Sequence, residues 1–471
     1  MAVQPVIPNA PGRVLSTMNE DGSRRWPRPR PAHGAWWQRR RAMAWFLMAF
    51  FLILPYVRVN GRPAVLLDLP QREFLLFGAR FLATDTVLFM LLMISTLIGI
   101  FLVTAVLGRV WCGWACPQTV YMEFLYRPIE YAIEGGPRGV EALDRQGGSP
   151  PRRLLKYLVF AVLACVLAHT FLAYFVGVER LAVWVRRSPF EHPTSFLVML
   201  GTTVAVFLDF AWFREQTCLV ACPYGRLQSV LLDRRSMVVG YDTLRGEPRM
   251  KGGARSLPVI AGDCVDCRMC VQACPTGIDI RDGLQMECVQ CTQCMDACDR
   301  VMTKLGRPQG LIRYGSRDGF ERRASSWLRP RVLLYPLVLL VTGGLFLGVL
   351  FTRQNLDVTL LRGKGEPYVI QHDGTLLHQV RIKFVNRVDA GREVRLVLTG
   401  ADDARLVAPV NPFPLRPMAM ATTTVFVITP PYGFHEGRRT VAFELTDGSG
   451  WRERQEWSLL GPDVEEGAAA R

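Results

Sequence analysis

Acidic residues are scarce in this chain of 471 residues. It has 41 Asp and Glu against 56 Lys and Arg, a formal net charge of +15, although half of its residues are hydrophobic. This combination favours a membrane protein with basic surface loops over a nucleic-acid binder, and we expect no nucleic-acid partner. The length predicts several structural units rather than one compact domain.

Cysteine is nearly absent outside four short motifs, which hold all of the 13 cysteines except Cys165. Disulfide frameworks scatter cysteines over small secreted chains, so the tight spacing excludes that class and indicates metal or cluster ligation. The N-terminus also lacks the apolar core of a cleavable signal, because residues 1–41 form a polar arm rich in Arg and Pro. We expect this arm to be flexible and cytoplasmic, with Trp36, Trp37 and Arg39–Arg41 at a membrane surface.

Five apolar runs are candidates for crossing a hydrocarbon core about 30 Å thick, which takes roughly 20 helical residues. They are residues 42–57, 86–107, 157–178, 193–213 and 332–351. The first is short and contains Pro55. Residues 1–41 and 108–156 carry eight and seven basic residues, against four and three in 58–85 and 179–192. This bias predicts that the N-terminus, the loop 108–156 and the segment 214–331 lie in the cytoplasm, and that residues 352–471 lie on the opposite side of the membrane.

Two cysteine cassettes lie at about 255–305, in the segment 214–331. They read CVDCRMCVQACP at 264–275 and CVQCTQCMDACD at 288–299, the bacterial ferredoxin spacing for 4Fe–4S clusters. In that spacing the fourth cysteine of one cassette ligates the cluster of the other. One cluster is therefore assigned Cys264, Cys267, Cys270 and Cys298, and the second Cys288, Cys291, Cys294 and Cys274. Zinc also accepts four cysteines, but it does not need the third cysteine and the x-x-x-Cys tail twice over.

Two further motifs, WCGWACP at 111–117 and TCLVACP at 217–223, each close an apolar run with the core Cys-x-x-Ala-Cys-Pro. On a helix, positions i and i+4 share a face, so we expect each cysteine pair to present both sulfurs together, with Pro117 and Pro223 disturbing the helix upstream. In the predicted topology both pairs meet at the cytoplasmic face. Four thiols there suit Cu(I), zinc or an iron–sulfur centre. Disulfide cycling and simple apolar packing are the alternatives.

The motifs resemble, in order and spacing, the cytochrome c oxidase accessory proteins called CcoG, FixG or RdxA. The resemblance rests on GRVWCGWACPQTVYMEFLYRPIEYAIEG, CLVACPYGRLQSVLLDRRSM, both cassettes and IDIRDGLQMEC, and it extends from about residue 40 to the C-terminus. It implies a polytopic protein of the bacterial inner membrane with two 4Fe–4S clusters and a periplasmic C-terminal domain at residues 352–471, which supports assembly of a high-affinity oxidase by reducing Cu(II) to Cu(I). Copper handling is implied for Cys112, Cys116, Cys218 and Cys222. We expect a cytoplasmic electron donor, and copper chaperones or oxidase assembly factors, as partners.

Residues 355–460 change to a period of two, as in HQVRIKFVN at 378–386 and TVAFELTDGSG at 440–450. Such short alternating strands predict an immunoglobulin-like sandwich, which has no cysteine and so no inter-sheet disulfide. The expected fold class is a membrane α-helical protein with a two-cluster ferredoxin segment and a C-terminal all-β sandwich.

His169 is an ionisable residue at membrane depth, where it could ligate copper, contact a quinone or hydrogen-bond to a neighbouring helix. Met90 and Met93 could offer thioether ligands to Cu(I), although methionines in spans more often serve packing. Three functions stay open: a cupric reductase in oxidase assembly, a quinol-linked ferredoxin-type electron-transfer subunit, and a non-enzymatic scaffold or redox sensor.

Overall fold

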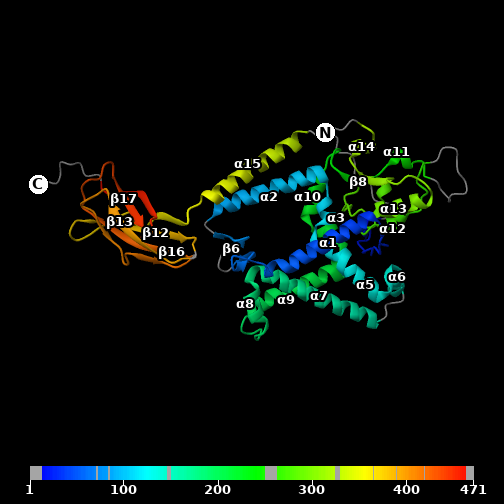
Figure 1. Ribbon diagram of the computed structural model, residues 1–471, viewed down its shortest axis with the longest axis horizontal. Helices are drawn as coiled ribbons and strands as arrows, with labels where there is room; N and C mark the ends of the chain where they lie inside the picture. Colours follow the sequence, from blue (N-terminus) through cyan, green and yellow to red (C-terminus); the bar gives the residue numbers. More distant parts are fainter. Residues whose placement is uncertain are drawn as a thin grey trace. The chain divides into compact units, whose positions relative to one another are not determined.

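The computed structural model of the chain describes residues 13–69, 73–82, 85–145, 150–249, 262–323, 329–363, 365–388, 390–417 and 419–462. Backbone contacts divide the chain into two compact units, residues 1–347 and residues 348–471. The first unit holds most of the helices and every cysteine, and the second holds the C-terminal strands (Figure 1).

Four helices in the described ranges are long and apolar enough to cross a membrane. They are α2 (Thr86–Leu107), α7 (Pro150–Val176), α9 (Pro193–Leu208), which continues as the π-helix η3 (Asp209–Phe213), and α15 (Pro330–Thr352). They coincide with four of the five predicted runs. Most of their apolar side chains are not covered by protein, as expected of surfaces that face lipid.

The fifth predicted run, residues 42–57, is not among these four helices. It forms the second half of α1 (Ala35–Ile53), whose first half carries Arg39–Arg41. The α-helix stops ahead of Pro55, which lies in the 3₁₀ turn η1 (Leu54–Tyr56), because a proline cannot donate the hydrogen bond that would continue the helix. The prediction of five spans is thus supported for four.

Short elements connect these helices. After α1 come the hairpin β3 (Arg58–Val59) and β4 (Arg62–Pro63), and a three-stranded antiparallel sheet of β5 (Val65–Asp68), β6 (Glu73–Leu76) and β7 (Ala79–Leu82). After α2 come α3 (Val110–Trp114), α4 (Pro117–Tyr121), the π-helix η2 (Met122–Tyr126), α5 (Arg127–Glu134) and α6 (Gly136–Arg145). Helix α8 (Val178–Val185) joins α7 to α9.

The cassettes belong to a region of short elements that follows η3. These are the π-helix η4 (Thr217–Ala221), α10 (Pro223–Leu231), β8 (Val238–Tyr241), α11 (Thr243–Gly246), α12 (Met269–Ala273), η5 (Ile280–Asp282), α13 (Gln293–Lys304), β9 (Ile312–Gly315) and α14 (Arg317–Phe320). Strands β8 and β9 pair antiparallel. Cysteines of both cassettes lie in the apolar core of this region together with Val239, Met302 and Leu311.

The described part of the N-terminal arm, residues 13–41, is packed against the cassette region, in contrast to the predicted flexibility. Strand β1 (Arg13–Leu15) pairs with β2 (Met18–Asn19), and the buried Ala32 donates its N–H to Gln293 Oε1 at 2.9 Å. The ring of Trp36 meets Tyr314 and Trp114, with centroids 5.4 Å and 6.2 Å away. Trp36 therefore packs against the cassette core, and its predicted place at a membrane surface stays a prediction.

An acidic side chain explains how the arm is held. The carboxylate of Asp296, on α13, accepts the N–H groups of Trp36 at 3.2 Å and of Trp37 at 2.7 Å. The first N–H groups of a helix have no partner within the helix, and a carboxylate there also meets the positive end of the helix dipole. The start of α1 is thereby fixed on α13.

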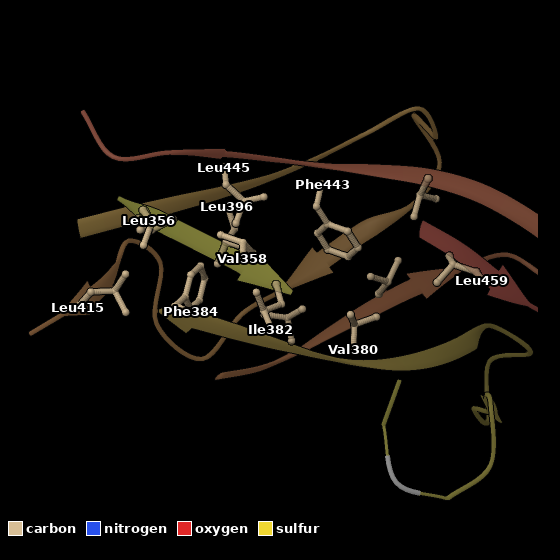
Figure 2. Close-up of a cluster of buried hydrophobic side chains, with 14 of the residues drawn as sticks. Leu356, Val358, Val380, Ile382, Phe384, Leu396, Leu415, Phe443, Leu445 and Leu459 are labelled. Atoms are coloured by element: carbon tan, nitrogen blue, oxygen red, sulfur yellow. The ribbon is translucent and has the colours of Figure 1, made fainter. Parts of the chain in front are cut away.

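The second unit is a β-sandwich of antiparallel strands. One sheet has the order β10–β12–β16–β14, with β11 paired to β12, and the other has the order β15–β13–β17–β18. The strands are β10 (Leu356–Arg362), β11 (Val369–Ile370), β12 (Leu376–Asn386), β13 (Arg392–Thr399), β14 (Arg405–Val407), β15 (Phe413–Leu415), β16 (Met420–Thr429), β17 (Arg438–Thr446) and β18 (Arg452–Leu460). Alternate side chains enter the core, which Figure 2 shows around Ile382, Phe384 and Phe443. The predicted sandwich is confirmed.

Candidate functional site

The two cassettes form loops with the same unusual backbone. In the first loop, Asp266 and Arg268 flank the second cysteine with φ of 47° and 55°, and in the second loop Gln290 and Thr292 do so with 55° and 60°. Residues other than glycine seldom adopt this left-handed conformation, and it persists where the surroundings or a ligand require it. Its recurrence at equivalent positions indicates that both loops enclose the same kind of group.

The fourth cysteine of each cassette lies with the other cassette. One small cavity is lined by Cys274 and Cys270, from the first cassette, and by the first three cysteines of the second cassette, Cys288, Cys291 and Cys294. Cys298 lies instead near Cys264, Cys267 and Cys270. Burial raises the pKa of the Cys298 thiol to about 12, and charges on those three cysteines contribute to the rise. Both positions are compatible with the exchanged ligand assignment, which stays a prediction.

Burial controls the chemistry of these thiols. It raises the pKa of Cys288 to about 11 and that of Cys270 to about 12, and it raises the pKa of Cys294 well above the ordinary value of a thiol. Such thiols stay protonated at neutral pH unless positive charge compensates the thiolate, and coordinated iron supplies that charge. The residues present therefore fit 4Fe–4S clusters in both their grouping and their need for bound metal.

The cysteine pairs of the other two motifs do not share a continuous helix. Helix α3 ends at Trp114, Cys116 is extended (φ −62°, ψ 125°), and Pro117 opens α4. In the same way Cys222 is extended (φ −77°, ψ 107°) after η4, and Pro223 opens α10. A residue before proline is pushed out of the helical conformation, and proline suits the first position of a helix. The prediction of an i, i+4 helix face was wrong for this reason.

The four cysteines nevertheless come together. Cys112 is buried against Val289 and Cys291 of the second cassette, and Cys218 packs at the edge of the same cluster. Burial raises the pKa of the Cys218 thiol, and charges on Cys116, Cys112 and Cys222 raise it further. The same mutual influence links Cys112 with Cys116 and Cys222, and Cys116 with Cys222, so each thiol is within electrostatic reach of the other three. We call these residues the four-cysteine site.

Two residues dock the four-cysteine site onto the second cassette. A Cβ atom added to Gly113 would lie 2.7 Å from the carbonyl oxygen of Val289, so only glycine allows the two backbones to approach this closely. Arg40 is 1% exposed and donates from Nε to the Gly113 carbonyl at 2.9 Å and from Nη1 to the Cys291 carbonyl at 2.6 Å. Its Nη2 lies 3.2 Å from a carboxylate oxygen of Glu123. Neither role was predicted from the sequence.

Arg109 adds positive charge between the two sites. It is 4% exposed and donates to the carbonyl of Met286, two residues before the second cassette. Its charge opposes the effect of burial on the pKa of both Cys112 and Cys288. A Cβ atom at Gly225 would lie 2.8 Å from Arg109 Nη2, which fixes the guanidinium beside α10.

Buried ion pairs hold the segment that carries the second motif. The Nη1 and Nη2 atoms of Arg214 lie 3.0 Å and 2.6 Å from the two carboxylate oxygens of Glu130 on α5. Lys156 Nζ lies 2.7 Å from Glu134, and Arg127 pairs with Glu215. Burial raises the pKa of Glu130, but the charge and hydrogen bonds of Arg214, together with the charges of Lys156 and Arg28, lower this pKa to about 2.

The intramembrane candidates lie elsewhere. His169 Nδ1 is 2.8 Å from the carbonyl oxygen of Cys165, so its hydrogen bond is to its own helix rather than to a neighbouring one. His169 also lines a cavity of about 160 Å³ with Trp184 and His192. Met90 and Met93 are exposed on α2. The structure does not bring any of these side chains to the four-cysteine site.

Across the described ranges, no three His, Cys, Asp or Glu side chains converge closely enough to hold one metal ion. This holds for the cassette cysteines and for the four-cysteine site alike. A larger cavity of about 390 Å³ lies beside the second cassette. Its walls include Trp37, Arg41, Trp45, Phe124 and Tyr131, together with Ala273 and Gln293, which directly precede Cys274 and Cys294 in the chain.

Three protein-family models match the chain. A 4Fe-4S binding domain matches residues 89–133, and a 4Fe-4S dicluster domain matches residues 213–317. The model of the IG-like fold at the C-terminal of FixG matches residues 346–462. The chain therefore carries iron–sulfur domains joined to a C-terminal domain of the FixG type.

Known proteins match most of the length. Protein RdxA and Protein RdxB of Cereibacter sphaeroides are each 33% identical, over 80% and 79% of this chain and 83% and 82% of their own. The nitrogen fixation protein FixG of Rhizobium meliloti is 30% identical over 89% of this chain and 90% of its own. A crystal structure of a FixG-related protein from Vibrio parahaemolyticus covers 23% of this chain and 98% of its own, at 15% identity and a TM-score of 0.21.

Proposed function

The chain belongs to the family of RdxA, RdxB and FixG, and from this premise we propose that it reduces Cu(II) to Cu(I) during assembly of a high-affinity cytochrome c oxidase. Its iron–sulfur domains make it an electron-transfer protein. The observation that carries the proposal is that Cys112 is buried in one apolar cluster with Val289 and Cys291, because this brings the four-cysteine site next to a predicted cluster ligand. A copper chaperone or an oxidase assembly factor would take up the Cu(I).

We assign the cluster ligands by the groups that the structure forms. The first cluster would be held by Cys264, Cys267, Cys270 and Cys298, and the second by Cys274, Cys288, Cys291 and Cys294. When bound, each cluster accepts and releases one electron at a time. Arg40 and Gly113 keep the second loop against the four-cysteine site, and Arg109 lowers the cost of negative charge there.

Copper enters this proposal as substrate. The family resemblance implies copper handling for Cys112, Cys116, Cys218 and Cys222. In the described ranges, however, no three of these side chains are close enough to one another to hold one metal ion. A tetrahedral thiolate site with metal–sulfur bonds of about 2.3 Å keeps its sulfurs close to one another. Cu(II) is therefore proposed as the electron acceptor of the four-cysteine site and not as its resident metal.

We further propose that α1 also enters the bilayer, which would complete the five predicted spans. Trp45, Phe46, Phe50 and Ile53 are exposed on its second half, with exposed fractions of 48% or more, and such a surface suits lipid better than water. The opposite end of α1 is fixed on α13 by Asp296. With the basic loops inside, the cassettes and the four-cysteine site would face the cytoplasm of the bacterium, and the β-sandwich the periplasm.

The test compares copper reduction by two variants. The full chain, reduced under anaerobic conditions, is mixed with Cu(II) and a Cu(I) indicator. We expect the variant with Cys112, Cys116, Cys218 and Cys222 changed to Ser to reduce copper at least tenfold more slowly than the parent. Cys165→Ser, on α7, is the matched control and should behave as the parent. Equal rates in the parent and the fourfold variant would refute the proposed exit site.

The cavity of about 390 Å³ favours a second candidate, in which a quinol donates the electrons. Aromatic side chains line it, and two of its wall residues directly precede cluster ligands. A quinol oxidised there would release two protons and pass one electron to each cassette cluster. We expect Trp45→Ala to slow cluster reduction by a soluble quinol but not by dithionite, with Phe46→Ala, outside the cavity, as control. Equal quinol rates in both variants would argue against this donor.

A further inference from the structure

We propose that Cys112, Cys116, Cys218 and Cys222 together hold a third cluster of the 4Fe–4S class. The inference concerns the resident group of the four-cysteine site, and only the use of this cluster, as the last station before copper, rests on the proposed function. Four independent features of the described residues support it, and they are taken in turn.

The first feature is local structure. Cys116 and Cys222 each precede a proline, as Cys274 does. Cys274 has φ −74° and ψ 121°, within about 15° of both angles at Cys116 and Cys222. Backbone N–H groups of residues 276–278 point to the sulfur of Cys274, and those of residues 118 and 119 to the sulfur of Cys116. The second cysteine of each motif therefore has the same local structure as Cys274, which is assigned to the second cluster. A ligand of this kind can accept N–H groups at its sulfur while the sulfur binds iron.

The second feature is spacing. Each sulfur in a 4Fe–4S cluster binds a different iron, so the ligand sulfurs stand farther apart than around a single ion. In the described ranges, no three of the cassette cysteines are close enough to one another to hold a single metal ion. The same is true of the four-cysteine site, whose thiols nevertheless influence one another electrostatically. This arrangement argues against one copper or zinc ion as the resident group.

The third feature is charge. Cys112 is buried, the other three thiols are half-buried, and Arg109 is a cation that acts on Cys112. Asp209 and Glu215 add negative charge beside Cys116 and Cys218. One Cu(I) would leave most of the charge of four thiolates uncompensated in a partly buried site, which is costly. An oxidised cluster core carries two positive charges and meets that cost better.

The fourth feature is the count of ligands. The family model for a 4Fe-4S binding domain matches residues 89–133, but this range contains only Cys112 and Cys116. A cluster with four thiolate ligands needs two more, and the fold supplies Cys218 and Cys222 at the same place. Gln228, fully buried on α10, accepts from the Cys112 sulfur at 3.0 Å and closes one side of the site.

The test is a count of iron and acid-labile sulfide in the full chain, purified anaerobically and reconstituted with iron and sulfide. Three clusters require about twelve irons per chain, and two require about eight. We expect about twelve, falling to about eight in a Cys112→Ser, Cys218→Ser variant that keeps the electron paramagnetic resonance signals of the cassette clusters. Cys165→Ser should keep all of the iron.

Several outcomes would overturn the third cluster. One is a count near eight irons per chain in the reconstituted parent. Another is one equivalent of copper that the parent binds and the variant does not. Mössbauer spectra of the ⁵⁷Fe-labelled parent provide a measure that does not depend on any variant folding: all iron in two cluster environments would contradict the proposal. Copper reduction is assayed separately, so twelve irons without copper reduction would sink the proposed function alone.

Discussion

Gly113 lies directly against the backbone of Gln290, so that a Cβ atom at Gly113 would be 2.4 Å from the Gln290 carbonyl oxygen. This contact joins the first Cys-x-x-x-Cys-Pro motif to the loop between Cys288 and Cys291. Two loops that are far apart in the sequence therefore pack so closely that a methyl group would not fit between them. The electron path proposed above depends on this approach.

Gly113→Ala should separate the two loops. The backbone on both sides has little freedom to move, and such overpacking costs about 1–3 kcal/mol. We expect the variant to keep its cassette iron and to reduce Cu(II) several-fold more slowly, as measured with a Cu(I) indicator. Gly99→Ala is the control, because nothing lies within 4 Å of a Cβ atom at that position on α2. A rate equal to that of the parent would show that the close approach is not needed.

Arg40→Gln should destabilise the protein strongly. The change leaves the buried carboxylate of Glu123 without its cation and removes the donors to Gly113 and Cys291. Loss of one partner from a buried ion pair costs about 3–5 kcal/mol. Thermal unfolding in detergent should show a clearly lower midpoint than for Arg39→Gln, an exposed neighbour. Arg40→Lys should be intermediate, because it keeps the charge but not the planar fork. Equal midpoints for the Arg40→Gln and Arg39→Gln variants would contradict this role.

Glu130 predicts a dependence of stability on pH. Its pKa is about 2 in the folded protein against an ordinary value of 4.5, so its ionised form stabilises the fold fully above pH 4.5. That contribution declines as the pH falls from 4.5 toward 2. Glu130→Gln should cost about 3–5 kcal/mol at pH 7, because Arg214 loses its buried partner.

The quantity to measure is the gap in unfolding midpoint between the parent and the Glu130→Gln variant. This gap should narrow when the pH is lowered from 6 to 3, whereas loss of clusters in acid affects both proteins. Glu141→Gln is the control, since Glu141 is partly exposed and lies 4.0 Å from Arg30. A gap that stays constant with pH would contradict the assigned pKa.

Phe443→Ala should weaken the β-sandwich alone. Phe443 is fully buried in the sandwich core, and a Phe→Ala change in such a site costs about 3–5 kcal/mol. Because residues 348–471 form a compact unit with its own core, hydrogen exchange should speed up in β12, β13, β16 and β17. Exchange in α12 and α13, and the iron content, should stay unchanged. Coupled loss of iron would show that the two units do not unfold separately.

Sequence reasoning worked where chemistry fixes the spacing along the chain. A four-iron cube dictates the intervals between Cys264 and Cys298, and a bilayer dictates the length of an apolar run, so that α2 has the predicted bounds of residues 86–107. The alternation of apolar and polar residues likewise predicted the strands β12 and β17. Each of these signals is local and is imposed by one dominant physical constraint.

The remaining features depend on distant partners. Arg40 meets Cys291, which lies 251 residues away, and nothing in the run Arg39–Arg41 distinguishes its middle member. Glu130 meets Arg214 across 84 residues. The extended conformation of Cys116 had a local signal, since the residue before a proline avoids the helix, but the i, i+4 spacing of the cysteines was given more weight.

The proposed exchange of Cys274 and Cys298 between the cassettes would make each loop dependent on the other, since neither cassette alone would supply all four ligands of a cluster. Oxidative loss of one cluster would leave one cysteine of the other cassette without its iron, and it would expose the protein between the two clusters to water. Damage would then spread from one centre to its neighbour. The pair would be lost, and would have to be rebuilt, as a single component.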